Sequence, residues 1–129
     1  MRPVQSISKE RIEANTIEEA EENLPMVALT KIYQEALDVS DYKRALRIKF
    51  LMILQSLIDK QMIVWKKRKT NEQYLIEISD VQIKDKFRSA VNLFDDVWYG
   101  ETKISSAQYE NAIQGLDALR TRIGSNAGQ

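Results

Sequence analysis

The apolar run at residues 45–54 constrains the fold of this chain more than any other feature. Its spacing predicts a helix over about residues 41–61 that is apolar nearly all round, with Ser40 as its N-cap. A helix of that kind lies at the centre of a domain, because each of its faces needs a cover. Its apolar residues are Leu46, Phe50, Ile53, Leu54, Leu57 and Ile58 on one face and Ile48, Leu51 and Met52 on the other.

Apolar spacing and capping signals predict four further helices, over about residues 25–39, 70–78, 80–99 and 105–124. The first of them should form an antiparallel hairpin with the central helix, because the link at Ser40 is tight. Residues 62–66 are β-prone and are expected to form one short strand or an extended segment. The predicted fold class is therefore all-α, a compact bundle of about five helices. The expected core includes Leu46, Phe50, Leu54, Phe87, Phe94 and Trp98.

The chain length suits one domain that needs no disulfide or metal to hold it together. It has 129 residues, and its 19 basic and 19 acidic residues balance, so no global charge favours nucleic acid or membrane. Residues 1–23 are interpreted as an acidic leader or linker, partly disordered and largely outside the core. Residues 24–124 form the predicted helical domain, and residues 125–129 a disordered tail. We find neither a signal peptide nor an apolar run long enough to span a bilayer.

The sequence contains no cysteine and no histidine. Their absence excludes thiolate chemistry and the histidine-dependent serine and cysteine mechanisms, and it removes the commonest metal ligands. The acidic pair Asp95 and Asp96 cannot share a catalytic site, because neighbours on a helix point about 100° apart. We therefore expect no catalytic residue, no metal site and no cofactor.

Residues 65–69, which we call the basic loop, concentrate positive charge in the sequence Trp65-Lys66-Lys67-Arg68-Lys69. Three interpretations stay open: a solvated loop between helices, a contact with a partner or with anionic lipid headgroups, and the wing of a nucleic-acid-binding domain. At about 1 kcal/mol per basic residue, the loop could orient a tethered domain on a membrane but not anchor a free one. Against nucleic acid, no helix carries the spaced Arg, Asn and Gln residues that read base edges.

Further candidate binding residues lie after the basic loop and at the end of the fourth predicted helix. Thr70 and Asn71 begin a helix whose free N–H groups could receive an anion, although capping alone explains both residues. Trp98 and Tyr99 either cover the core or form an aromatic docking surface. The full candidate set is Trp65, Lys66, Lys67, Arg68, Lys69, Thr70, Asn71, Tyr74, Trp98 and Tyr99.

Several short elements follow one another over about residues 28–120. They are Asp41-Tyr42 with Ala45-Leu46-Arg47, Leu57 through Met62-Ile63, Lys69-Thr70-Asn71 with Tyr74-Leu75, Phe87-Arg88, Phe94 with Val97-Trp98-Tyr99-Gly100, and Ile104 with Tyr109. In this order they resemble domain-of-unknown-function family 4129. The sequence departs from the family pattern at Ser40 and Gln61, where the family often has Gly, and at Lys67 and Arg68, where it has Pro and then Gly or Asp.

The resemblance implies a cellular setting and no reaction. Members carry this domain after a transmembrane helix, on the cytoplasmic side of bacterial membrane proteins that include membrane-anchored transglutaminase-like proteins. It implies that this chain is an excised soluble part of such a protein, with residues 1–23 as the juxtamembrane linker. The expected function is a non-catalytic interaction or regulatory domain that binds a protein partner or another domain of its parent chain, with weak contact to anionic lipid headgroups. Nucleic-acid binding through the basic loop is the alternative.

Overall fold

Helices account for most of the computed structural model, which describes residues 11–100 and 103–125. Its elements are β1 (Ile12–Glu13), α2 (Ile17–Glu22), the 3₁₀ helix η1 (Leu24–Met26), β2 (Val27–Ala28), α3 (Thr30–Asp38), α4 (Tyr42–Asp59), α5 (Asn71–Glu77), α6 (Val81–Tyr99) and α7 (Ser106–Ser125). The predicted all-α class is confirmed, and α3 to α7 are the five expected helices. Helix α2 is additional to these five, and it begins where the sequence Thr16-Ile17-Glu18-Glu19 allows a short capped helix. The two-stranded sheet was not predicted.

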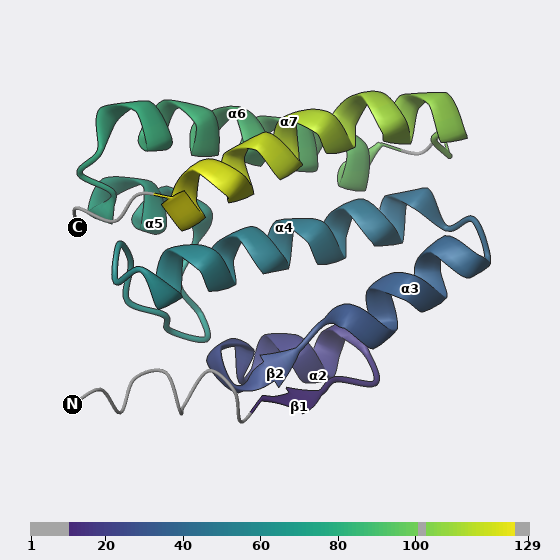
Figure 1. The fold of residues 1–129 in the computed structure, drawn as a ribbon, viewed down its shortest axis with the longest axis horizontal. Coiled ribbons are helices and arrows are strands. Elements are labelled where there is room, and N and C mark those ends of the chain that lie inside the picture. Colours follow the sequence, from purple (N-terminus) through teal and green to yellow (C-terminus); the bar gives the residue numbers. More distant parts are fainter. Residues whose placement is uncertain (1–10, 101–102, 126–129) are drawn as a thin grey trace.

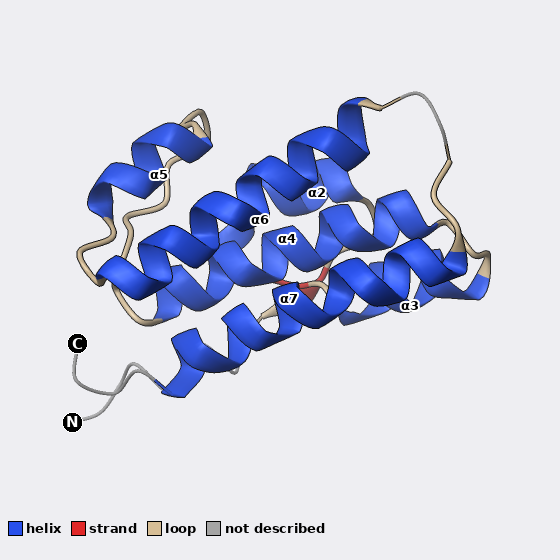
Figure 2. Ribbon diagram, turned by 90° about the horizontal axis from the view of Figure 1, so that it is seen from above, coloured by secondary structure: helices blue, strands red, loops and turns tan. Residues whose placement is uncertain are grey.

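Helix α4 runs through the centre of the molecule (Figure 1). Helices α6 and α7 cover one side of it, and α3 with the N-terminal elements covers the other. Eleven of its 18 residues are buried, as a helix apolar nearly all round requires. Seen from above, α5 lies beside one end of α6 (Figure 2). The predicted central helix is thus confirmed.

The turn between α3 and α4 differs from the prediction. Ser40 is not the N-cap of α4, because Asp41 takes that place and its side chain accepts a hydrogen bond from the Arg44 amide at 3.2 Å. Ser40 has a φ of 57°. Its amide donates to Leu37 O at 3.0 Å, and the Asp41 amide donates to Ala36 O at 2.8 Å. This is the pattern that ends a helix with one left-handed residue, usually glycine.

The same pattern ends α4. Gln61 has a φ of 61°, its amide donates to Ile58 O at 2.9 Å, and the Met62 amide donates to Leu57 O at 2.9 Å. The chain then continues through residues 62–66 without a strand, so the expected short element there is an irregular segment. Both ends of α4 are therefore bordered by a non-glycine residue in a conformation that favours glycine.

Helix α3 begins at Thr30, five residues later than the predicted start at Pro25. Pro25 belongs instead to η1. The buried side chain of Gln55 donates to the carbonyl oxygens of Leu24 at 2.9 Å and Val27 at 2.6 Å. These two bonds satisfy backbone acceptors that an irregular segment would otherwise leave unpaired, which explains why the chain breaks the helix here.

Residues 14–20 contradict the prediction that the acidic leader lies outside the core. Ala14, Ile17 and Ala20 are at most 2% exposed and belong to the main hydrophobic core. The first strand also binds this segment to the domain, since β1 pairs in parallel with β2. Their spacing of three residues puts these apolar side chains on one face, while the glutamates point outward. Residues 1–10 of the leader and residues 126–129 of the predicted tail lie outside the described residues.

Two capping predictions are confirmed, and two core predictions are wrong. Thr70 and Gln73 exchange hydrogen bonds at the start of α5, and Ser105 and Gln108 do so at the start of α7. Leu46, Phe50, Leu54 and Phe87 are buried as expected. Phe94 and Trp98 are only half-buried. Phe94 packs against the core from its edge, and Trp98 stacks on the outer side of Phe94.

Candidate functional site

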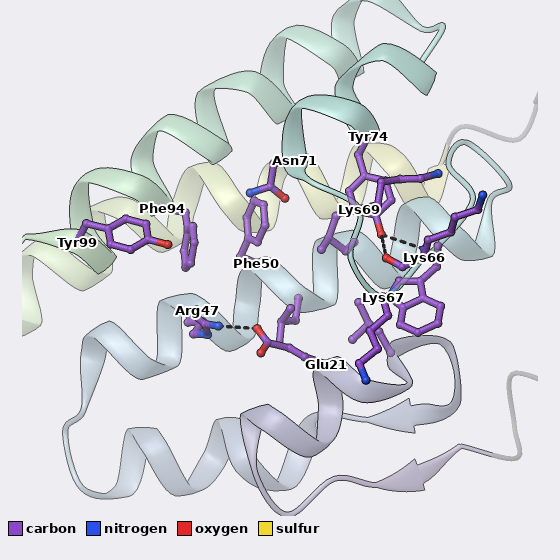
Figure 3. A pocket seen from close by; sticks show the side chains of 14 residues that line it. Glu21, Arg47, Phe50, Lys66, Lys67, Lys69, Asn71, Tyr74, Phe94 and Tyr99 are labelled. Carbon is purple, nitrogen blue, oxygen red and sulfur yellow. Dashed lines mark hydrogen bonds and ion pairs between the residues drawn. The ribbon is translucent and has the colours of Figure 1, made fainter.

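A pocket of about 320 Å³ lies between the N-terminal elements, the basic loop and helices α4, α5 and α6 (Figure 3). Helix α4 contributes Arg47, Phe50, Leu51 and Leu54, while Glu21 and Leu24 come from α2 and η1. The rest of the lining is Trp65, Lys66, Lys67 and Lys69 from the basic loop, Asn71 and Tyr74 from α5, and Phe94 and Tyr99 from α6. Segments far apart in the sequence therefore converge on one concave surface.

The pocket is rich in cationic side chains. Arg47, Lys66, Lys67 and Lys69 line it, and among the residues that the structure describes Glu21 is the only carboxylate in the lining. Lys67 pairs with Glu22 at 2.6 Å, outside the lining. Lys66 makes no ion pair with any residue in the described part of the chain. The arrangement offers charge for an anionic group and provides no pair of carboxylates for acid–base chemistry.

Arg47 has the most unusual surroundings of these cations. One guanidinium nitrogen, Nη2, donates to Glu21 at 2.5 Å. The guanidinium carbon lies 4.5 Å from the centre of the Trp98 ring and 5.7 Å from that of Phe94. Among the described residues, its Nε has no hydrogen-bond partner and is buried. A buried donor left unpaired costs about 1–3 kcal/mol, so an acceptor that reached this atom would relieve that cost.

A row of stacked aromatic rings leads from the core to Arg47. The ring centres are 5.7 Å apart for Phe50 and Phe87, 5.0 Å for Phe50 and Phe94, and 6.2 Å for Phe94 and Trp98. Burial falls along the row, from Phe87, which is fully buried, to Trp98, which is half-buried. The row holds the guanidinium against a rigid apolar wall, as cation–π contacts require.

The basic loop is held firmly to α5. The Tyr74 hydroxyl donates to Lys66 O at 3.1 Å and accepts from the Lys66 amide at 3.3 Å. Lys69 pairs with Glu77 and donates to Val64 O at 2.6 Å. Although partial burial raises the pKa of the Glu77 carboxyl, hydrogen bonds from Lys69 and the Val64 amide outweigh it and hold that pKa below its ordinary value.

A β-turn sets the shape of the loop tip. The Lys69 amide donates to Lys66 O at 3.1 Å, which places Lys67 and Arg68 at the two central positions of the turn. Together with the contacts to α5, this turn fixes the backbone that carries the four basic side chains. The loop is therefore a preformed part of the pocket wall.

The structure brings together seven of the ten candidate residues. Those that line the pocket are Trp65, Lys66, Lys67, Lys69, Asn71, Tyr74 and Tyr99. Arg68 lies outside the lining, and Thr70 serves as the N-cap of α5. Trp98 supports the pocket through its stacks on Arg47 and Phe94. The sequence analysis missed Arg47 and Glu21. The signal for Arg47 was its charge in the apolar run, since a cation in a buried helix needs a partner.

A second polar cluster lies on the side of α4 that faces α7. Lys49 is only 7% exposed, pairs with Asp117 at 3.0 Å, and lies 4.7 Å from the centre of the Tyr33 ring. Tyr33 and Tyr109 share a hydrogen bond between their hydroxyls. Burial, with this hydrogen bond, raises the pKa of Tyr109 far above its ordinary value, so its phenol stays neutral.

Three further observations concern function. Within residues 11–100 and 103–125, no helix combines the length and apolarity needed to cross a bilayer, and no three acidic residues lie close enough to hold a metal ion. The resemblance to family 4129 stays a prediction. Comparisons of the chain with protein-family models, with curated proteins and with solved structures found no match.

Proposed function

We propose that this chain is a non-catalytic helical interaction domain, which binds a protein partner or another domain of its parent chain through the pocket beside the basic loop. The observation that carries the proposal is the convergence of Arg47, three lysines and five aromatic side chains on one preformed concavity. Arginine, tryptophan and tyrosine are the residues that dominate binding energy in protein interfaces. A pocket lined with these residues suits the recognition of a partner, while one carboxylate in the described lining does not provide the pair that acid–base catalysis uses.

We further propose that the parent is a bacterial membrane-anchored protein with this domain on its cytoplasmic side, as in family 4129. Backbone geometry at four departures from the family pattern supports the resemblance. Ser40 and Gln61, where the family often has Gly, have φ angles of 57° and 61°. Lys67 and Arg68 stand where the family has Pro and then Gly or Asp, and they are the centre of a β-turn. Each position thus has a backbone that suits the family's residues.

The nucleic-acid alternative has weaker support. Lys67 and Lys69 of the basic loop already pair with Glu22 and Glu77, so the loop presents less free charge than its sequence suggests. Phosphate contacts depend on free cations that release counterions on binding. A weak contact with anionic lipid headgroups needs the same free charge, and it remains a secondary role for Lys66 and Arg68.

A capture experiment with matched charge variants tests the proposal. The test variant combines Lys66→Glu with Arg68→Glu, because neither side chain makes an ion pair in the described structure and the fold should survive. The control combines Lys86→Glu with Arg120→Glu, two exposed positions on α6 and α7 outside the pocket. Each tagged domain is incubated with lysate of the source organism, and the bound proteins are identified by mass spectrometry.

The proposal predicts a protein that the wild type and the control capture and that the test variant loses. Thermal unfolding of all three proteins must show the same midpoint within a few degrees, so that a loss of capture reports the surface. The same proteins on all three baits, or none on any, would contradict recognition through this pocket. Nuclease treatment that removes the captured protein would instead favour the nucleic-acid alternative.

A further inference from the structure

Two carboxylates of α2 already bind cations at the pocket. Glu21 Oε2 lies 2.5 Å from Arg47 Nη2, and Glu22 Oε1 lies 2.6 Å from Lys67 Nζ. Figure 3 shows the Arg47–Glu21 pair along one edge of the pocket with Lys67 close to Glu21, and Phe50, Phe94 and Tyr99 on the other side of that pair. Consecutive acidic residues of one short segment therefore contact two cations at one edge of the pocket.

These two ion pairs are easily exchanged. The side chains of Glu21 and Glu22 are 41% and 65% exposed, and that of Lys67 is 50% exposed. Ion pairs with such exposure contribute about 0–1 kcal/mol, because water solvates the separated charges well. Helix α2 itself is held through Ile17 and Ala20 in the core, so its carboxylates can turn to solvent without undocking the helix.

The pocket also has donors that α2 leaves unused. Arg47 Nε is buried without a partner, and the Lys66 ammonium pairs with no carboxylate in the described residues. Asn71 adds an amide to the lining. An incoming acidic segment would therefore make the bonds that Glu21 and Glu22 make now, together with charge-assisted bonds that the folded chain does not provide.

The lining also has an apolar part beside its cations. Phe50, Leu51 and Leu54 of α4 lie along the pocket, and Leu24 and Phe94 flank them. The volume of about 320 Å³ is at the lower end of the range for ligand pockets, roughly 300–1,000 Å³. It suits one or two apolar side chains of a peptide better than a large cofactor. The ligand should thus carry apolar groups between its carboxylates.

We propose that the pocket binds an acidic peptide segment, with aromatic or aliphatic side chains between its Asp and Glu residues, and that Glu21 and Glu22 compete with it for Arg47 and Lys67. The proposal rests on the proposed function, since it names the chemical class of the partner. Charge complementarity selects this occupant, because the described part of the lining has four cations and one carboxylate. The competing carboxylates favour strongly acidic segments, because a segment with few carboxylates gains little over the pairs that it replaces.

Peptide display against the whole chain tests the partner class. A random library of 12-residue peptides is selected on the wild-type protein, and the enriched sequences are synthesised with a fluorescent label. We expect enriched peptides with several Asp or Glu residues around Phe, Trp or Leu, and anisotropy titrations that weaken steeply with salt. Lys66→Glu with Arg68→Glu should weaken their binding about tenfold, while Lys86→Glu with Arg120→Glu should leave it unchanged.

The competition by α2 has its own test with the same labelled peptides. Glu21→Gln with Glu22→Gln frees Arg47 and Lys67, and we expect binding to tighten about three- to tenfold. Glu35→Gln with Glu110→Gln is the control, because it changes the net charge equally at two exposed positions outside the pocket. Equal tightening in both variants, or none in the first, would overturn the competition.

The remaining outcomes separate this inference from the proposed function. Enriched peptides without acidic residues, or no enrichment, would overturn the acidic partner, while the lysate capture would still decide whether the pocket recognises any protein. Binding of a single-stranded oligonucleotide or of phosphatidylglycerol vesicles as tight as that of the peptides would make the site a general polyanion surface and overturn the proposal. Loss of both peptide binding and pocket-dependent capture would remove the proposed function as well.

Discussion

Arg47 and Lys49 are cations two residues apart on α4, and their surroundings differ sharply. Because successive residues of a helix are about 100° apart, the two side chains leave α4 on opposite sides. Lys49 points to α7, is 7% exposed, and binds Asp117 and the face of Tyr33. Arg47 points to the pocket, and its Nε is buried without a partner.

The difference lies in how the polar groups on the two sides of α4 are paired. Around Lys49, every polar group named has a partner within the chain, as buried polar groups in a stable core do. Around Arg47, the folded chain supplies one exposed carboxylate, from Glu21, and leaves one donor unpaired. A buried donor without a partner lowers stability, and its position beside the pocket supports the binding role that we propose for Arg47. The α7 side pairs its polar groups within the chain, and the pocket side leaves one unpaired among the described residues.

The largest expected loss of stability lies at the buried end of the aromatic row that leads to Arg47, and it is compared with the loss at the exposed end. Phe87→Ala should lower the free energy of unfolding by about 3–5 kcal/mol, because the ring is fully buried. Trp98→Ala should cost only about 1–2 kcal/mol, because that ring is already partly exposed. Urea unfolding followed by circular dichroism measures both. Equal losses would show that Trp98 belongs to the core and would remove the contrast between the two sides.

Lys49 gives the next largest effect and tests whether its side of α4 is structural. Lys49→Ala removes a long buried stem and should cost about 2–3 kcal/mol. Lys49→Met keeps most of the volume and should cost under about 1 kcal/mol, because Asp117 is 54% exposed and water can solvate it. Neither variant should change peptide binding at the pocket. A loss of binding in Lys49→Met would show that the two sides are coupled.

The sequence predicted the helices well because their signals are local. Apolar spacing, the capping boxes at Thr70 and Ser105, and the continuous run of α4 all act within one or two turns. The burial of residues 14–20 was missed because six glutamates between residues 10 and 22 suggested a solvated segment. The apolar spacing of Ala14, Ile17 and Ala20 was present, but short side chains give a weak signal, and the contact with α4 is not local.

Part of the candidate site could also be predicted, because its signals are local in the sequence. The basic loop and α5 are neighbours in the sequence, so their shared role was visible from residues 65–74. Arg47 and Glu21 join the pocket only through packing between distant segments, which no local pattern specifies. Trp98 was placed in the core because it ends an apolar stripe, whereas in the structure it stacks on Phe94 and Arg47 at the edge of the core and stays partly exposed.

Lowering the pH should reduce the free energy of unfolding through protonation of Glu77, which holds Lys69 beside the pocket. Its pKa is lowered in the folded state, so the stabilisation is present above the ordinary value of 4.5 and is lost as the pH falls through the folded-state pKa. The stability difference between the wild type and Glu77→Gln, about 1 kcal/mol near neutral pH, should therefore shrink below pH 4.5. Tryptophan fluorescence during urea unfolding measures it, since Trp65 lines the pocket and Trp98 stacks on Arg47. A difference that persists down to about pH 2 would contradict the role of this carboxylate.

The smallest expected effects lie at the two ends of α4. Ser40→Gly and Gln61→Gly should each raise the free energy of unfolding by about 0.5 kcal/mol, because glycine relieves a left-handed conformation. The gain is modest because glycine also has more freedom in the unfolded chain. Urea unfolding of the two variants and of the double variant measures it, with Ser106→Gly in helix α7 as a control that should lose stability.

Ser40 precedes α4 on the side of α3, whereas Gln61 leads toward Trp65 and the pocket. Equal gains would attribute the strain to the backbone alone. A gain at Ser40 with a loss at Gln61 would show that the Gln61 side chain stabilises the approach to the basic loop, and that the pocket side depends on it.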